Sequence, residues 1–147
     1  MPSPRVAVRA VILRDDRLLL VNAWKGRTHL WTCPGGGVEV HRSLPENLAR
    51  EVMEETGIEV AVGEPCLVNE FHDPEGPFHQ VDIYFRCQIL SGNPQVDWTD
   101  PEGIVSHRIW VAREEMSRVR VKPDSLAAAA WGGSAAILYD PLEPIVR

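Results

Sequence analysis

The segment that decides the fold runs from Gly36 to Ile58 and reads GGVEVHRSLPENLAREVMEETGI. Its second part predicts a helix, because Ser43 is a suitable N-cap residue and Glu46, three residues later, completes a capping box. Gly57 is a natural C-cap, since glycine adopts the left-handed conformation at little cost. At about 100° per residue, one arc of this helix is expected to face a core, and it consists of Leu48, Ala49, Val52 and Met53.

A second arc of the same helix carries Glu51, Glu54 and Glu55. Like charges at this spacing repel by roughly a few tenths of a kcal/mol per pair, and by more when they are partly buried. Their grouping therefore indicates a positive partner, and Mg²⁺ or Mn²⁺ is the natural candidate for oxygen ligands. Arg50 could orient a neighbouring carboxylate. The helix alone leaves open a solvated acidic face with an Arg50–Glu54 salt bridge.

The glycine run Pro34–Gly37 precedes the helix and predicts a loop, because only glycine tolerates several unusual backbone angles in succession. Such a loop exposes backbone that could ligate a metal or approach a phosphate. From Gly36 to Ile58 the sequence resembles the Nudix box, G-x5-E-x7-R-E-U-x-E-E-x-G-U, in which U is a bulky apolar residue. The box closes at Arg50–Ile58, but its first glutamate falls at residue 42, which is Arg42 here.

The resemblance to Nudix hydrolases implies an α/β fold, a Nudix-type α/β/α sandwich with a mixed β-sheet. One domain is expected over residues 1–147, with the box at 36–58 and a C-terminal tail at 133–147. The implied function is Mg-dependent hydrolysis of a phosphoanhydride bond in a nucleoside diphosphate linked to another moiety, or in a nucleoside triphosphate. Because Arg42 replaces a box glutamate, a catalytically weakened nucleotide-binding or regulatory domain is the alternative.

The same resemblance implies roles for single residues. Glu54 and Glu55 would be the main metal ligands, and Glu51 either a ligand or the base that activates water. The Gly35 carbonyl could complete the ligand shell of Mg, or of Mn as a substitute. Arg50 would hold the glutamates in place, so the catalytic candidates are Glu51, Glu54 and Arg50.

Candidates outside the box have ordinary structural alternatives. Lys25 and Arg27 could contact a terminal phosphate or belong to a solvated charged loop. Glu102 could contact substrate or serve as the general base. The other candidates for the base are Asp97, Asp100 and His107, although the simpler interpretation of His107 is a surface histidine with no role. An aromatic platform for a base, or simply core packing, is predicted for Trp24, Phe71, Phe78 and Tyr84.

The remaining patterns predict strands and two short helices. Asp15-Asp16 is a hairpin signal between the first two strands. The predicted strands are Arg5–Leu13, Arg17–Val21, Trp31–Cys33, Ile58–Val62, Cys66–Phe71, Gln80–Leu90 and Arg108–Val111. The predicted helices are Arg113–Arg118 and Asp124–Trp131, and polar connections are expected at 72–79 and 91–103.

Composition limits the partners. The formal net charge of −6 leaves no broad basic surface for a nucleic-acid polymer, so a small nucleotide or nucleoside-diphosphate substrate is expected. The three cysteines form no CxxC pair, which argues against a disulfide framework and favours a reducing, cytoplasmic setting. No apolar run approaches the length of a membrane span. The apolar tail Ser134–Arg147 should pack on its own domain or on a second subunit, and the resemblance favours a homodimer.

Overall fold

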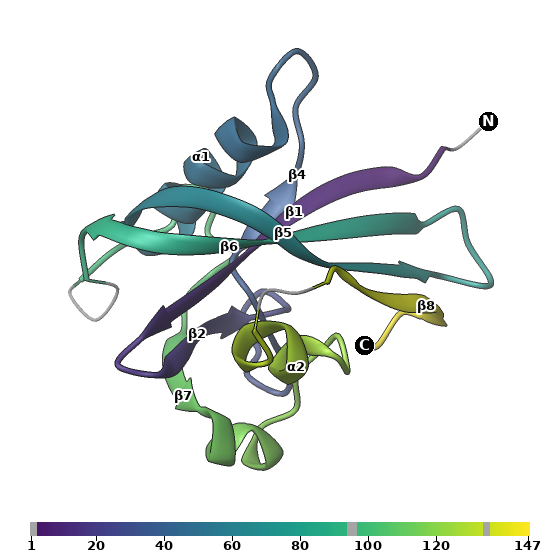
Figure 1. Ribbon diagram of the computed structural model, residues 1–147. Helices are drawn as coiled ribbons and strands as arrows, with labels where there is room; N and C mark the ends of the chain where they lie inside the picture. The colour runs from purple at the N-terminus through teal and green to yellow at the C-terminus, as the bar shows by residue number, and fades with distance from the viewer. Residues whose placement is uncertain (1–2, 94–96, 134–135) are drawn as a thin grey trace.

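The computed structural model describes residues 3–93, 97–133 and 136–147. Its mixed β-sheet is flanked by helices (Figure 1). The strands are β1 (Arg5–Arg14), β2 (Arg17–Asn22), β3 (Trp31–Thr32), β4 (Gly35–Gly37), β5 (Glu59–His72), β6 (His79–Ser91), β7 (Arg108–Ala112) and β8 (Leu138–Pro144). The helices are α1 (Leu44–Thr56), the 3₁₀ helix η1 (Arg113–Arg118) and α2 (Leu126–Trp131). The predicted segments 91–103 and 134–147 include residues 94–96 and 134–135, which lie outside the described ranges.

The sheet joins strands that are distant in sequence. Its order is β3-β2-β1-β6-β5-β8, with β4 also paired to β1 and β7 to β2. The β1–β6 and β5–β8 pairs are parallel, and the other pairs are antiparallel. The predicted hairpin at Asp15-Asp16 is confirmed, since both residues have positive φ, 51° and 60°, as the favoured two-residue turn requires.

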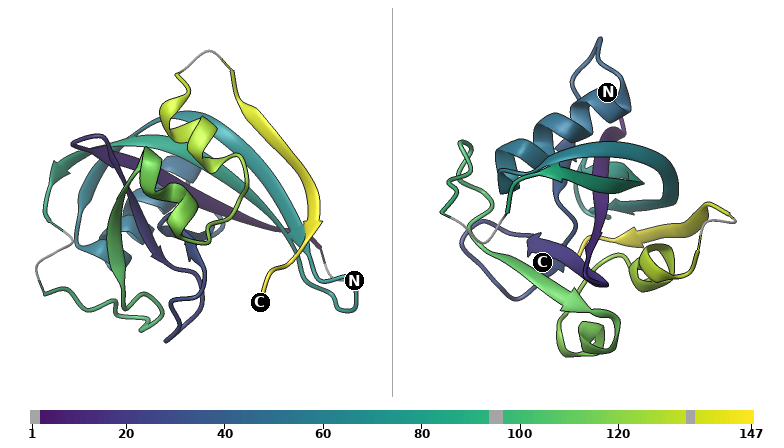
Figure 2. Two further views of the ribbon diagram at one scale, coloured as in Figure 1. Left: turned by 90° about the horizontal axis from the view of Figure 1, so that it is seen from below. Right: turned by 60° about the vertical axis from the view of Figure 1, so that its left-hand side comes forward.

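Two apolar cores lie on opposite faces of the sheet. Along β1, Val8, Ala10 and Ile12 pack in the core that contains Leu48 of α1. Val11 points the other way and packs with residues of η1 and α2. Figure 2 shows the same arrangement, with α1 on one side of the sheet and the other two helices on the opposite side. The predicted α/β/α sandwich is therefore confirmed.

Both predicted ends of α1 are confirmed. Ser43 Oγ accepts the Glu46 N–H at 3.2 Å, and Gly57 adopts a left-handed φ of 74°. The predicted core arc is only half right, because Met53 is exposed and Ala49 is half-buried. Compared with the predicted orientation, the helix is rotated about its axis, so that Asn47 and Glu51 are buried. It thus presents part of its acidic face to β4 rather than to solvent.

The loop predicted at Pro34–Gly37 is wrong, because Gly35–Gly37 form β4 and pair with β1. A Cβ at Gly35 would lie 1.9 Å from the Val8 carbonyl oxygen. Glycine here permits a close approach of two backbones. A run of glycines in the sequence does not show whether it serves such close packing or unusual backbone angles.

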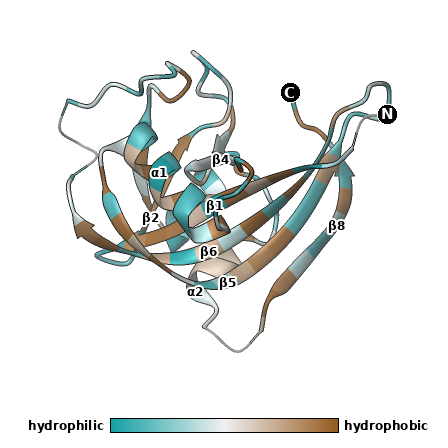
Figure 3. Cartoon of the chain, turned by 90° about the horizontal axis from the view of Figure 1, so that it is seen from above, coloured by the Kyte–Doolittle hydropathy of each residue, from teal (hydrophilic) through white to brown (hydrophobic). Residues whose placement is uncertain are grey.

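Two further expectations change at the other edge of the sheet. The separate strands predicted at Ile58–Val62 and Cys66–Phe71 are one strand, β5, with register shifts on both sides of Pro65. The C-terminal segment forms β8 and pairs in parallel with β5, so it packs on its own domain. Figure 3 shows both apolar and polar residues along β5 and β8. Among the described residues, no helix is long and apolar enough to cross a membrane.

Candidate active site

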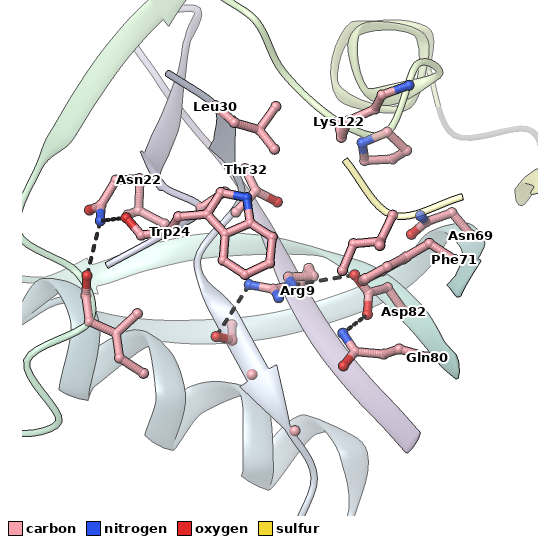
Figure 4. Close-up of a pocket in the computed structure, with 18 of the residues that line it drawn as sticks. Arg9, Asn22, Trp24, Leu30, Thr32, Asn69, Phe71, Gln80, Asp82 and Lys122 are labelled. Carbon is pink, nitrogen blue, oxygen red and sulfur yellow. Dashed lines mark hydrogen bonds and ion pairs between the residues drawn. The ribbon is translucent and has the colours of Figure 1, made fainter. Parts of the chain in front are cut away.

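A cavity of about 850 Å³ lies beside β1 and runs from α1 to the C-terminal segment. We call its two ends the helix end and the sheet end. The helix end is lined by Gly35, Gly36, Gly37, Glu39, Arg50, Glu51 and Glu55. The sheet end, part of which Figure 4 draws, is lined by Trp24, Asn69, Phe71, Gln80 and Asp82.

At the helix end, the β4 glycines make room for two carboxylates of α1. The Gly35 N–H donates to Glu55 Oε1 at 3.0 Å. A Cβ added at Gly36 would lie 2.7 Å from Glu51 Oε2, closer than such contacts allow. The box therefore places Glu51 and Glu55 against a backbone that has no side chains to displace them.

Arg50 contacts two of the three carboxylates of α1, those of Glu51 and Glu54. Its Nη1 lies 3.1 Å from Glu51 Oε1 and 3.4 Å from Glu54 Oε1. Its Nη2 donates to Asn47 Oδ1 at 3.1 Å. The Arg50–Glu54 salt bridge is therefore present, and Arg50 also contacts Glu51, as expected of a residue that keeps the glutamates in place.

Burial is the largest influence on the pKa values of Glu51 and Glu55. The pKa of Glu55 is raised to about 8, mainly by burial, with Arg9 and the Gly35 N–H acting against the rise and the charges of Glu51 and Asp100 adding to it. Burial also raises the pKa of Glu51, which the Arg50 guanidinium lowers and Glu54 and Glu102 raise again. The helix end thus gathers carboxyl groups in a poorly solvated place, where their ionised forms are disfavoured and a bound cation would stabilise them.

The donor set fits a hard divalent cation. Within the part of the chain that the structure describes, no three His, Cys, Asp or Glu side chains stand ready to hold a metal ion. However, Glu54 Oε2 is buried without a hydrogen-bond partner, which is a costly state for a carboxylate oxygen. Oxygen ligands of this kind suit Mg²⁺ or Mn²⁺. The Gly35 carbonyl, the fourth expected ligand, accepts a long hydrogen bond of 3.4 Å from Arg9 Nη1.

The candidates from outside the box divide into two groups. Lys25 and Glu102 are exposed and line the cavity, whereas Arg27 and Asp97 are exposed and are not among its described lining residues. Glu54 also lies outside that lining. Of the charged candidates Lys25, Arg27, Asp97 and Glu102, the described lining of the cavity therefore includes Lys25 and Glu102.

Asp100 and His107 have structural partners. The Asp100 carboxylate is 4% exposed and accepts the backbone N–H groups of Glu102, Ile104 and Val105. The His107 ring lies 2.9 Å from Ser106 Oγ, on the surface. Asp100 thus shapes the loop that presents Glu102, which leaves Glu102 the better placed of the two acids to act as a base.

Sequence reasoning missed the buried ion pair at the centre of the cavity. Arg9 Nε lies 3.5 Å from Asp82 Oδ2, and Arg9 Nη1 donates to the Cys33 carbonyl at 3.2 Å. Gln80 Nε2 donates to Asp82 Oδ1 at 2.7 Å (Figure 4). Two features of the sequence could have indicated this pair. One is the charged Arg9 inside an otherwise apolar predicted strand, and the other is the polar residues at alternate positions of Gln80–Tyr84.

The four aromatic candidates all line the cavity, but they differ in burial. Trp24 and Phe71 line the sheet end, and Phe78 packs on Phe71 with ring centroids 5.6 Å apart. Tyr84 also lines the cavity but is 1% exposed and packs in the core. The Trp24 indole donates to the Val146 carbonyl at 3.2 Å. The C-terminal segment thus helps to hold one wall of the sheet end.

Comparison with known proteins follows this geometry. The NUDIX domain family matches residues 3–131. A MutT-like protein of Streptomyces ambofaciens is 32% identical over 111 residues, which cover 70% of this chain and 68% of that protein. An ADP-ribose pyrophosphatase of Methanocaldococcus jannaschii is 32% identical over 93 residues, which cover 60% of this chain and 53% of that protein.

The fold also matches a solved structure. A UDP-X diphosphatase superposes with a TM-score of 0.73 at 23% identity, over 95% of this chain and 68% of that chain. The first curated relatives are longer proteins, and the aligned region spans 44%, 34% and 53% of their lengths.

Proposed function

Because this chain belongs to the NUDIX domain family, we propose that it is a pyrophosphohydrolase that cuts the phosphoanhydride bond of a nucleoside diphosphate linked to another moiety. A nucleoside triphosphate is a second form of the same substrate class. The observation that carries the proposal is the single cavity in which Glu51 and Glu55 line one end and Trp24 and Phe71 line the other. Its size suits a ligand that has both a diphosphate and an aromatic ring.

At the helix end, Glu54 and Glu55 are the proposed main ligands of Mg²⁺, with Glu51 as a third ligand or as the base. When bound, the metal neutralises charge on the phosphate oxygens and lowers the pKa of water. Glu102 lines the cavity close enough to raise the pKa of Glu51, which makes it the second candidate for accepting the proton of the attacking water. Arg50 keeps two of the carboxylates in position.

Between the two ends, positive charge is available to the substrate's diphosphate. The Arg9 guanidinium lines the cavity and lies within 3.4 Å of the Gly35 carbonyl, next to the helix end. Lys25 is exposed at the rim. We assign Lys25 the contact with a terminal phosphate and Arg9 the neutralisation of charge within the cavity. Arg27 is not among the described lining residues and receives no such role.

At the sheet end, Trp24 and Phe71 are the proposed walls for the aromatic ring of the nucleoside. Asn69 and Asp82 are 3% exposed and line the same end, so polar groups on the ring would meet partners there. Two relatives named for ADP-ribose and UDP-linked substrates support a nucleoside diphosphate of this general form.

The alternative is a nucleotide-binding or regulatory domain with little turnover. Arg42 in place of a box glutamate favours it. A panel of nucleoside-diphosphate sugars, dinucleotides and nucleoside triphosphates, incubated with Mg²⁺ or with EDTA, separates the two. The proposal expects phosphate-bearing products from at least one substrate, in Mg²⁺ only. Binding of a substrate without any product would contradict it.

A homodimer also remains a proposal. β8 is the edge strand of the sheet, and Ile137, Tyr139 and Leu142 expose 56%, 59% and 44% of their surface there. An edge strand with exposed apolar side chains offers a surface that a second copy could cover. Truncation after Gly133 followed by light scattering tests the role of this segment. A full-length protein that is monomeric at micromolar concentration would rule out the dimer.

A further inference from the structure

Asn47 is a polar residue that is fully buried in the first turn of α1. Its Oδ1 accepts the Glu39 N–H at 2.8 Å and Arg50 Nη2 at 3.1 Å. Its Nδ2 lies 2.9 Å from the Ser43 carbonyl oxygen, with the Arg42 and Glu39 carbonyls at 3.3 and 3.4 Å. One carboxamide thus joins the segment 39–43 to the side chain of Arg50.

The surroundings of Arg50 show why this contact matters. Its other neighbour on Nη2 is Glu39 Oε1, which is 3.8 Å away on a side chain that is 59% exposed. Arg42 is 54% exposed and its Nε lies 3.9 Å from Glu39 Oε2, and an arginine side chain has only donors to offer. Asn47 Oδ1 is therefore the buried acceptor that fixes one nitrogen of the guanidinium, while Glu51 and Glu54 bind the other.

We propose that Asn47 is a positioning residue for the cation site: it orients Arg50, and through Arg50 it sets Glu51 and Glu54 in the arrangement that binds a divalent cation. A planar guanidinium held at both ends has a defined orientation. Without the Asn47 contact, Arg50 retains its carboxylate partners but can turn about them. This inference rests on the proposed function, because it assigns Asn47 a role at the same metal site.

A purely structural role is the competing explanation, since Asn47 also ties the segment 39–43 to α1. The two roles differ in one contact, because a structural tie requires the bonds to Glu39 and Ser43 but not the bond to Arg50. A buried asparagine at the other end of the cavity provides a matched control. Asn22 is 2% exposed and makes four hydrogen bonds of 2.9–3.0 Å to backbone groups, none of which belongs to a residue of α1.

The experiment is a titration of the full chain with MgCl2 alone, in which the dependence of Tm on the Mg²⁺ concentration is fitted to an apparent Kd, called the midpoint below, that does not depend on turnover. Asn47→Ala should raise the Mg²⁺ concentration of the midpoint by about tenfold or more. About tenfold is the smallest loss of affinity that is usual when a residue supporting a metal ligand is removed. Asn47→Asp retains the oxygen that Arg50 binds but loses the amide donors. It should therefore lower the metal-free Tm while keeping the midpoint within about threefold of the wild type.

Two further variants complete the test. Asn22→Ala should lower the metal-free Tm and leave the midpoint unchanged. In an Arg50→Ala background, Asn47→Ala should shift the midpoint no further, because residues that act through one another are not additive.

A wild-type midpoint in Asn47→Ala, or an equal shift with and without Arg50, would overturn the positioning role and leave the proposed function standing. If Asn47→Ala does not fold, Asn47→Asp decides: a shift of tenfold or more despite the retained oxygen would overturn the role. A wild-type protein whose Tm does not respond to Mg²⁺ or Mn²⁺ would instead contradict the proposed metal site itself.

Discussion

The helix end of the cavity is assembled from residues close together in sequence, whereas the sheet end gathers residues from distant strands. Gly35–Glu55 supply the helix end within one strand–turn–helix unit. The sheet end needs β1, β5 and β6 side by side, with the C-terminal segment against Trp24. The difference suggests a division of labour in which a local motif carries the chemistry and the long-range topology selects the substrate.

The largest expected effect comes from the helix end. Glu54→Gln/Glu55→Gln removes two proposed metal ligands, so kcat should fall by more than the roughly 10- to 100-fold typical of residues that only support a ligand. The fold should persist, because the change also relieves repulsion between buried carboxylates. Steady-state kinetics and the Tm of the metal-free protein measure both effects. The control is Glu59→Gln/Glu64→Gln, which makes the same charge change at exposed positions of β5. Wild-type turnover in the Glu54→Gln/Glu55→Gln variant would contradict the site assignment.

The second prediction concerns the ion pair between the two ends. Arg9→Met leaves Asp82, which is 4% exposed on its side chain, without its cation, and breaking a buried pair from one side costs about 3 kcal/mol or more. Urea denaturation should show that loss, and Arg9→Met/Asp82→Asn should recover part of it. Arg14→Met, at an exposed position of the same strand, is the control. Equal stability of the Arg9 variant and the wild type would show that the pair contributes nothing to the fold.

A smaller change is expected from the wall of the sheet end. Trp24→Ala should raise KM about threefold to tenfold while kcat stays nearly constant, since stacking on an aromatic ring contributes about 0.5–1.5 kcal/mol. Trp24→Phe retains the ring and should keep KM within about twofold. A drop in kcat with unchanged KM would mean that the two ends do not divide their roles as described.

The smallest effect is expected at Arg42, which is mostly exposed. Arg42→Glu places a carboxylate near the cation site, and the Coulomb attraction there is on the order of 1 kcal/mol. Mg²⁺ binding should tighten, or kcat should rise, by about fivefold at low salt. Arg42→Gln separates the loss of positive charge from the gain of negative charge. If neither variant changes either quantity, residue 42 is a tolerated surface position.

What the sequence could predict follows the same division. A local pattern predicted the caps of α1 and the grouping of the glutamates around Arg50, and the structure has those caps and the contacts of Arg50 with Glu51 and Glu54. The roles of these residues stay predictions. Arg9 and Asp82 were missed because their meeting depends on the parallel pairing of β1 with β6, which links residues about 70 positions apart. The inward turn of Asn47 was also missed, because helical periodicity groups apolar residues and gives no sign of a buried carboxamide.

The most direct test of the central claim, that water attacks a phosphoanhydride at the helix end, is hydrolysis in ¹⁸O-labelled water. A nucleoside diphosphate-linked substrate would be incubated with Mg²⁺, and both products would be analysed by mass spectrometry. The predicted result is one ¹⁸O atom in a phosphate group of one product, with no reaction in EDTA. Label in a product without phosphate, or the same cleavage in EDTA, would contradict it.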